Sequence, residues 1–247
     1  MNILLNGAKG GMGSEVIKYL KNTDDKIICG FDTKRESGQF EIYNDISDIN
    51  EKVDVIIDFS VPKASLEILK YAKKTNTPVV IATTGFDEKQ MKIIEEYSKI
   101  IPIFKSSNMS LDIKLMTKIV KEISKVLKQA DIEIVETHHN RKIDSPSGTA
   151  LLLANAINET FENQKTYTFD RMQKRQKREK REIGFSSIRG GNIKGEHTVI
   201  FFGENESLEV THKAYSREVF VEGALKAAHF LINKKPGLYN MDDLIKW

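Results

Sequence analysis

The chain has 247 residues, enough for one large domain or two smaller ones with a buried core. Hydrophobic residues make up 40% of it and charged residues 30%, a balance that excludes a disordered protein. The formal net charge is only +3, and no apolar stretch approaches the roughly 20 residues of a membrane helix. Composition therefore predicts neither a polyanionic partner nor a membrane.

Cysteine usage and the amino-terminal segment indicate a compartment. Cys29 is the single cysteine, which excludes an intramolecular disulfide and a thiolate metal site. The segment from Met1 to Gly7 has no basic leader and only a short apolar run, so no signal peptide is expected. We expect a soluble protein of the cytoplasm.

Short apolar runs rich in β-branched residues alternate with amphipathic segments in the first part of the chain. The runs at 3–5, 27–29, 53–57, 79–81 and 101–104 predict strands of a sheet buried on both faces. The segments at 14–21, 63–73 and 88–98 have helical spacing, and Pro62 suits an early helical position. Because repeated strand–helix–strand units imply right-handed crossovers, we predict a Rossmann-type, doubly wound parallel sheet.

The pattern of predicted helices and strands changes after this part of the chain. Residues 111–127 predict a long amphipathic helix, 132–136 a strand, and Ser147 the start of another helix. Three further strands are predicted at 183–188, 196–202 and 208–212, separated by glycine-containing turns. A last helix at 217–231 ends before Pro236-Gly237. Consecutive strands fit an α+β domain with a mixed sheet.

The first predicted strand runs directly into a glycine-rich turn and a helix. The turn is Gly7-Ala8-Lys9-Gly10-Gly11-Met12-Gly13, a Gly-x-x-Gly-x-x-Gly variant of the dinucleotide fingerprint. Glycines allow close approach to a pyrophosphate, and the helix start attracts its charge. Asp32 ends the second strand, where a carboxylate accepts hydrogen bonds from ribose hydroxyls. This order predicts NADH or NADPH as cofactor; the alternative is a glycine-rich turn of an unrelated α/β domain with a solvated Asp32.

Small polar residues follow the fourth and fifth predicted strands. Ligands of open α/β sheets bind outside the carboxyl ends of the strands, so these loops are candidates for the nicotinamide end of the cofactor. Such residues are also common in loops without function. The candidates are Ala82, Thr83, Thr84, Ser106, Ser107, Asn108 and Met109.

The densest cluster of chemically active residues lies between Glu136 and Thr149. His138, His139 and Lys142 can bind an anion and supply protons near neutral pH. Ser147 resembles an N-cap, which leaves the N–H groups near Gly148 and Thr149 available to a carboxylate. The alternative is a solvated loop before a capped helix. No metal is predicted, because adjacent histidines in an extended segment point to opposite faces.

Several segments resemble the dihydrodipicolinate reductase family, in the same order and over essentially the whole chain. They are residues 7–13, 82–86, 108–110, 136–150, 188–199 and 212–217.

The resemblance implies an NAD(P)H-dependent reductase. Its reaction would convert 4-hydroxy-tetrahydrodipicolinate, by way of dihydrodipicolinate, to tetrahydrodipicolinate in lysine and diaminopimelate biosynthesis. The substrate would be a cyclic imine dicarboxylate, with His138 as proton donor or acceptor and Lys142 as proton donor. His139, Gly148 and Thr149 would bind the substrate.

The resemblance also implies a domain division and an assembly. Residues 1–109 and 217–247 would form the dinucleotide-binding domain, and 110–216 the substrate-binding and oligomerisation domain of a homotetramer. Two departures affect the cofactor loops: Gly11 stands where the family commonly has arginine, and Ser107 where proline is usual. Residues 112–114 also depart from the family's usual segment.

Other classes of protein compete with the reductase. The basic run at 171–181 suits a nucleic-acid-binding module, although it lacks aromatic residues for base stacking, and a solvated loop is the simpler interpretation. A second rival is a cofactor sensor without turnover. A third is a dehydrogenase of another family, but no Tyr-x-x-x-Lys pair is present and Cys29 lies inside a predicted strand. We predict the reductase, with neither nucleic acid nor membrane as partner.

Overall fold

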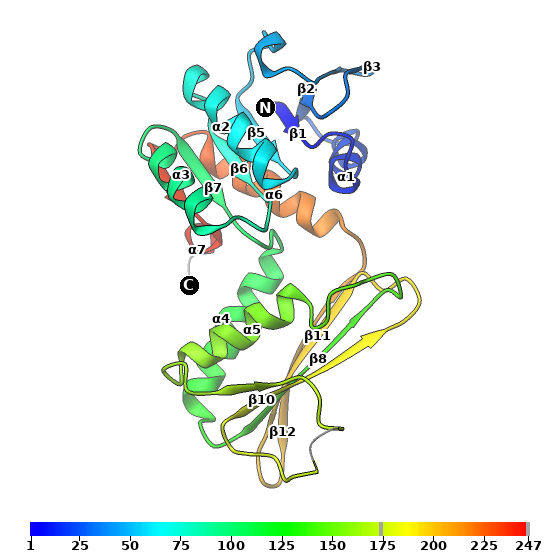
Figure 1. The fold of residues 1–247 in the computed structure, drawn as a ribbon, viewed down its shortest axis with the longest axis vertical. Coiled ribbons are helices and arrows are strands. Elements are labelled where there is room, and N and C mark those ends of the chain that lie inside the picture. Colours follow the sequence, from blue (N-terminus) through cyan, green and yellow to red (C-terminus); the bar gives the residue numbers. More distant parts are fainter. Residues whose placement is uncertain (173–174, 246–247) are drawn as a thin grey trace. The chain divides into compact units, whose positions relative to one another are not determined.

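The computed structural model describes residues 1–172 and 175–245 and divides into two compact units (Figure 1). The first unit comprises Met1–Leu111 with Arg217–Trp247, and the second comprises Asp112–Ser216. Every helix in the described part of the chain is too short or too polar to cross a membrane.

The first unit is built on a sheet with the strand order β13-β7-β6-β5-β1-β2-β4-β3. β1 lies between β2 and β5 and pairs with both in parallel, and the chain changes direction across the sheet at this point. This is the predicted doubly wound fold, which is confirmed. The strands are β1 (Asn2–Asn6), β2 (Lys26–Phe31), β3 (Glu36–Ser37), β4 (Glu41–Tyr43), β5 (Val55–Asp58), β6 (Val79–Ile81), β7 (Pro102–Lys105) and β13 (Gly237–Tyr239).

Alternating side chains of the strands fill a separate core on each face of this sheet. Ile3 and Leu5 of β1 pack with α1 and α6, whereas Leu4 packs with α2 and α3 on the other face. Residues on successive positions of a strand point to opposite faces, which explains the continuous apolar runs in the sequence. The helices are α1 (Gly11–Leu20), α2 (Pro62–Thr75), α3 (Glu88–Ser98), α6 (Glu218–Leu231) and α7 (Met241–Leu244), with a 3-10 turn at Ile46–Asp48.

The second unit is a mixed sheet with α4 (Leu111–Val126) and α5 (Gly148–Glu159) packed on one face. Its strand order is β12-β11-β8-β10-β9; β8 is parallel to β10 and antiparallel to β11. The residues of β8 are alternately half-buried and buried, and the buried set faces the helices. The strands are β8 (Asp131–His138), β9 (Thr166–Thr168), β10 (Glu182–Arg189), β11 (Gly195–Phe202) and β12 (Ser207–Ala214).

Candidate active site

The glycine-rich turn after β1 is tight because two of its glycines admit no side chain. Gly7 has φ +81°, in the left-handed region that favours glycine, and its N–H donates to the Phe31 carbonyl at 2.9 Å. A Cβ on Gly13 would lie 2.2 Å from the Gly7 carbonyl oxygen. The backbone therefore folds closely onto the start of α1. Among the described residues, no side chain caps α1 at Gly10, so the helix start is open to a phosphate.

Arg217 lies beside this turn, which sequence reasoning did not anticipate. A Cβ on Gly11 would be 3.4 Å from the Nη1 atom of Arg217. The guanidinium, at the N-cap of α6, thus brings a positive charge to the start of α1. At position 11 this chain has glycine where the family commonly has arginine. A cation is nevertheless present there, because Arg217 supplies it from a distant part of the chain.

Asp32 lies at the end of β2 and faces the glycine-rich turn. Its Oδ2 accepts the backbone N–H of Lys9 at 2.8 Å, and its Oδ1 accepts that of Thr33 at 2.7 Å. The side chain of Lys9 forms an ion pair with Glu36. The carboxylate is therefore held next to the turn, in the position expected of a ribose ligand.

A buried carboxyl group organises the neighbouring strand ends. Asp58, at the end of β5, is fully buried and accepts hydrogen bonds from Asn6 at 2.9 Å and from the Ser60 N–H at 3.0 Å. Burial raises its pKa, although hydrogen bonds from Ser60, Ser65 and Thr83 act in the opposite direction. The Ser60 N–H also donates to the Thr83 hydroxyl at 3.0 Å. Asp58 and Thr83 thus fix the loops at the switch point of the sheet.

The remaining cofactor candidates occupy three kinds of position. The side chains of Ala8 and Met109 are buried in the core of the first unit, so that only their backbone could contact a ligand. Ser106 and Asn108 shape their own turn, since the Ser106 hydroxyl donates to the Asn108 carbonyl at 2.6 Å. Four candidates are exposed or partly exposed: Met12 in the first turn of α1, and Ala82, Thr84 and Ser107 after the strand ends.

In the second unit, Glu136 is the centre of the histidine and lysine cluster. Its carboxylate is buried and accepts hydrogen bonds from both terminal nitrogens of Arg189, at 2.6 and 2.8 Å. The Nδ1 atom of His138 lies 2.5 Å from Oε2 of Glu136. Burial acts to raise the pKa of Glu136, but hydrogen bonds from Arg189, Ser187 and His138 outweigh it and give a pKa of about 2. Glu136 is therefore ionised at neutral pH.

A second histidine, His197, packs against His138 from β11. The two rings meet edge to face with centroids 5.2 Å apart, and Nε2 of His197 lies 2.9 Å from the Ser147 hydroxyl oxygen. Burial lowers the pKa of His197 to about 3, and the positive charge of Lys142 acts in the same direction. His197 is thus neutral near physiological pH and connects the sheet to the start of α5.

The predicted N-cap of α5 is confirmed. The Ser147 hydroxyl accepts the Ala150 N–H at 3.1 Å, and the first residues of the helix are Gly148 and Thr149. Backbone N–H groups of a first helical turn attract anions. The helix start and the Glu136 carboxylate are joined by the Ser147 N–H, which donates to Oε1 at 3.3 Å.

Lys142 lies in the loop between β8 and α5. Its ammonium group pairs with Asp144 at 2.7 Å, and the hydrogen bond from Lys142 lowers the pKa of that carboxyl group. Its side chain is only 20% exposed, so the ammonium is held in the cluster and not extended into solvent. His139 is fixed through its backbone N–H, which donates to the Ile193 carbonyl at 2.8 Å. The structure therefore gathers His138, Lys142 and the start of α5 in one unit.

Our sequence analysis did not assign Glu136, Arg189 and His197 to the candidate site, where the structure places them beside His138. Glu136 and His138 are two apart on β8, a spacing that places them on one face, but the predicted strand ended at Glu136. Extending that strand by two residues would have indicated the contact. Arg189 lies 53 residues from Glu136 in sequence, and His197 lies opposite Glu136 on β11, so neither contact follows from local pattern.

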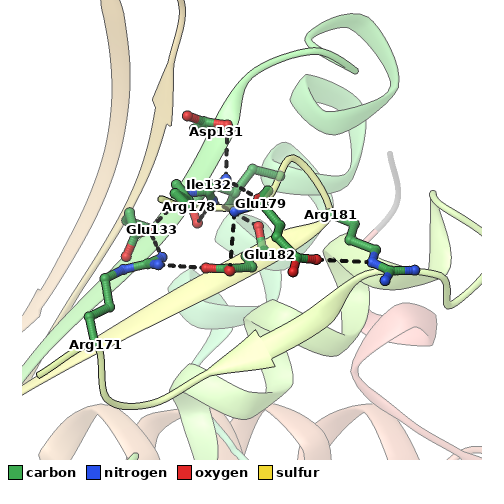
Figure 2. A network of polar contacts seen from close by, with 8 residues as sticks. All are labelled: Asp131, Ile132, Glu133, Arg171, Arg178, Glu179, Arg181 and Glu182. Carbon is green, nitrogen blue, oxygen red and sulfur yellow. Dashed lines mark hydrogen bonds and ion pairs between the residues drawn. The ribbon is translucent and has the colours of Figure 1, made fainter. Parts of the chain in front are cut away.

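Three arginines of the basic run that favoured nucleic-acid binding, Arg171, Arg178 and Arg181, are paired with acids (Figure 2). Arg178 donates to Asp131 at 2.8 Å and to Glu133 at 3.1 Å, and Arg171 donates to Glu133 at 2.7 Å. Arg171 also contacts Glu182 at 2.5 Å. Lys174 lies outside the described residues. These pairs bind the segment to the starts of β8 and β10, which supports the structural interpretation of the run.

Cys29 is fully buried in β2, and burial raises the pKa of its thiol to about 12. A protonated, inaccessible thiol cannot act as a nucleophile. This position weighs against the thiohemiacetal chemistry of another dehydrogenase family.

The cluster in the second unit combines an ionised acid, two histidines, a lysine and a helix start. Such a set can hold a carboxylate, keep an imidazole in one tautomer and donate a proton. The turn and strand ends of the first unit offer the elements of a dinucleotide site. Together they provide the parts that a reductase of a small anionic substrate needs.

Comparisons with known proteins give the same assignment along the whole chain. The family model described as dihydrodipicolinate reductase, N-terminus, matches residues 1–109, and the one described as dihydrodipicolinate reductase, C-terminus, matches residues 112–245. Two relatives named 4-hydroxy-tetrahydrodipicolinate reductase are similar over nearly their full lengths. The protein of Caldanaerobacter subterraneus is 49% identical over 100% of this chain and 98% of its own. That of Clostridium novyi is 46% identical over 99% and 98%.

Solved structures agree on the fold. A dipicolinate-bound dihydrodipicolinate reductase from Paenisporosarcina sp. TG-14 has a TM-score of 0.83, covers 99% of both chains and is 22% identical. A diaminopimelate dehydrogenase of C. glutamicum has a TM-score of 0.56 at 14% identity, covering 98% of this chain and 92% of its own. At these identities the likeness concerns the fold.

Proposed function

The chain belongs to the dihydrodipicolinate reductase family, and from this premise we propose that it reduces 4-hydroxy-tetrahydrodipicolinate, by way of dihydrodipicolinate, to tetrahydrodipicolinate. The step belongs to lysine and diaminopimelate biosynthesis, and we place it in the cytoplasm. The observation that carries the proposal is the cluster around His138, Lys142 and the start of α5. This cluster suits a substrate that carries two carboxylates and needs a proton when hydride is added.

Residues of the first unit would hold NADH or NADPH, which supplies the hydride when bound. The absence of side chains at Gly7 and Gly13 lets the turn fold closely onto the start of α1, whose open end would attract the charge of a pyrophosphate. Asp32 would accept the ribose hydroxyls. The polar loops after β6 and β7 would contact the nicotinamide end. The residues present therefore fit the cofactor.

In the second unit each residue would have a separate role. The substrate loses water to give a conjugated imine, and hydride addition to that system leaves electron density that needs a proton. Lys142 would donate this proton, and His138 would donate or accept protons at its free nitrogen. His139 and the N–H groups of Gly148 and Thr149 would bind a substrate carboxylate.

A coupled assay tests the proposal directly. 4-Hydroxy-tetrahydrodipicolinate is generated enzymatically in the cuvette, and oxidation of NADH is followed by absorbance at an appropriate wavelength. We expect turnover that depends on both the substrate and this protein. Binding of cofactor without any oxidation would instead indicate a sensor.

We predict that the protein uses both cofactors, with NADH at least as effective as NADPH. Asp32 repels a 2′-phosphate, but Lys9, Lys34 and Arg35 bring compensating positive charge nearby, although Lys9 pairs with Glu36 and Arg35 lies 3.5 Å from Glu41. Measurement of kcat/KM with NADH and with NADPH tests this prediction. A preference for NADPH above about tenfold, or about 1.4 kcal/mol, would show that the basic residues outweigh Asp32.

Arg217 would contact the cofactor phosphates. Its guanidinium lies beside Gly11 at the open start of α1, where a pyrophosphate would bring negative charge. We expect Arg217→Ala to raise the KM for cofactor about tenfold with little change in kcat, and the effect to shrink at high salt. Arg217→Lys should recover part of the loss. An unchanged cofactor KM in Arg217→Ala would remove this residue from the site.

We predict a homotetramer, with residues 110–216 supplying the interfaces as well as the substrate site. Val199 and Phe201 of β11 are buried against the helices, whereas on the opposite face Ile200 is half-buried and Phe202 is 41% exposed. Apolar residues on a face without helices favour pairing with another copy. Light scattering at micromolar concentration should give the mass of four chains; the mass of one chain would contradict the prediction.

A further inference from the structure

We propose that Glu136 is a positioning residue that fixes the tautomer of His138 for the proposed reduction. The inference rests on the proposed function, because His138 takes part in proton transfer only if the protein is a reductase. It is carried by a chain of contacts that runs from Arg189 through Glu136 to His138.

The carboxylate of Glu136 can only accept hydrogen bonds, because the surrounding donors keep it ionised. Its Oε2 lies 2.5 Å from Nδ1 of His138, so this nitrogen must carry a proton. In a neutral ring the other nitrogen, Nε2, is then the acceptor. A carboxylate that orients a histidine in this way is a recurrent device of proton-transferring sites.

The other ring nitrogen of His138, Nε2, lies next to Gly195, which has no side chain to cover it. Gly195 begins β11, one residue before Glu196, which pairs with Thr137 of β8. A Cβ on Gly195 would lie 3.1 Å from Nε2 of His138. Any larger residue at this position would crowd the nitrogen. Nε2 is thus the ring atom available to exchange a proton with a substrate.

The same carboxylate aligns the rest of the cluster. Its Oε1 accepts the Ser147 N–H at 3.3 Å, at the start of α5. Arg189, held by Glu136, donates to the Asp144 carbonyl at 2.8 Å in the loop that carries Lys142. Glu136 therefore joins the strand of His138, the lysine loop and the helix start, which are the three parts that the reaction must bring together.

Stability alone gives a weak reason for this arrangement. Burying a carboxylate and a guanidinium costs desolvation free energy that their attraction often fails to exceed, and apolar replacements of similar volume are frequently as stable. The two charges are partly enclosed, with Glu136 buried and the Arg189 side chain 20% exposed. Control of His138 provides the functional reason.

The decisive experiment compares Glu136→Gln with Glu133→Gln. Glu133 lies on the same strand and also accepts hydrogen bonds from two arginines, Arg171 and Arg178 (Figure 2). It lies on the opposite face of the strand from Glu136, away from the helices. A glutamine at 136 has an amide group that donates to Nδ1 of His138 and so moves the ring proton to Nε2. We expect kcat to fall about 10²-fold or more with cofactor KM unchanged.

Glu133→Gln should lower the melting temperature and leave kcat within about twofold of the wild type, since it removes ion pairs distant from the cluster. A merely structural role of Glu136 predicts the same behaviour for both variants. A wild-type kcat in folded Glu136→Gln would overturn the proposal. If this variant does not fold, Glu136→Asp keeps the charge for Arg189 but withdraws it from His138; a wild-type kcat there would also overturn it.

A spectroscopic measurement separates this inference from the proposed function. Long-range ¹H–¹⁵N correlation spectra show which nitrogen of the neutral His138 ring carries the proton. We expect Nδ1–H in the wild type and Nε2–H in Glu136→Gln; the same tautomer in both would refute the role of Glu136. A wild-type protein without turnover would refute the reductase function instead.

Discussion

The Lys142→Ala and His138→Gln variants should each lose about 10²- to 10⁴-fold in kcat while cofactor binding persists. Hydride addition leaves electron density on the substrate, and without a positioned acid the proton must come from solvent. Lys142 is held in place by Asp144, 2.7 Å away, and His138 by Glu136, so each variant removes a group whose position is already fixed. Steady-state kinetics with cofactor and substrate varied separately give kcat and the KM for cofactor.

Lys128→Ala is a suitable control, because this lysine is exposed and lies after the end of α4, outside the cluster. It should keep the wild-type kcat. Thr149→Val, at the start of α5, should act mainly on the KM for substrate, because a binding contact persists through the reaction. Near-normal kcat in Lys142→Ala, with intact NADH binding, would show that the proton comes from elsewhere.

The second large effect is expected from Gly13→Ala. Its Cβ would lie 2.2 Å from the Gly7 carbonyl oxygen and 2.7 Å from that of Ala8. Both are backbone atoms of the glycine-rich turn, so the turn itself must move. Overpacking of this kind typically costs about 1–3 kcal/mol of folding free energy. We expect the cofactor KM to rise more than about tenfold, together with a lower melting temperature.

Gly38→Ala is the matched control, because a Cβ at Gly38 would meet no atom within 4 Å among the described residues. It lies in the same unit as Gly13, and the substitution is identical. Cofactor KM and melting temperature should stay near those of the wild type. Equal behaviour of the two variants would mean that the close packing of Gly13 does not shape the cofactor site.

Local pattern alone predicted most of the first unit. The apolar runs marked β1, β2, β5, β6 and β7, because strands buried on both faces need continuous hydrophobic residues. The short strands β3, β4 and β9 were missed, since two or three residues carry no readable period. β13 was also missed: Pro236-Gly237 was interpreted as a helix end, yet the residues that follow pair with β7.

The sequence also determined the parts of the candidate site that are contiguous in the chain. The glycine-rich turn with Asp32, the cap at Ser147 and the grouping of His138 with Lys142 all depend on neighbours in sequence, where spacing fixes direction. The roles proposed for these residues stay predictions until the variants are measured.

Only the tertiary structure decided which distant residues contact the candidate site. Glu136 and Arg189 are 53 residues apart, and they meet because β8 and β10 pair in one particular register. Arg217 reaches Gly11 because α6 packs on the same face of the first sheet as α1. Such contacts arise from strand pairing and helix packing, which join segments that have no common local pattern. The charge state of a buried group depends on these neighbours, so it is set by the fold and not by sequence spacing.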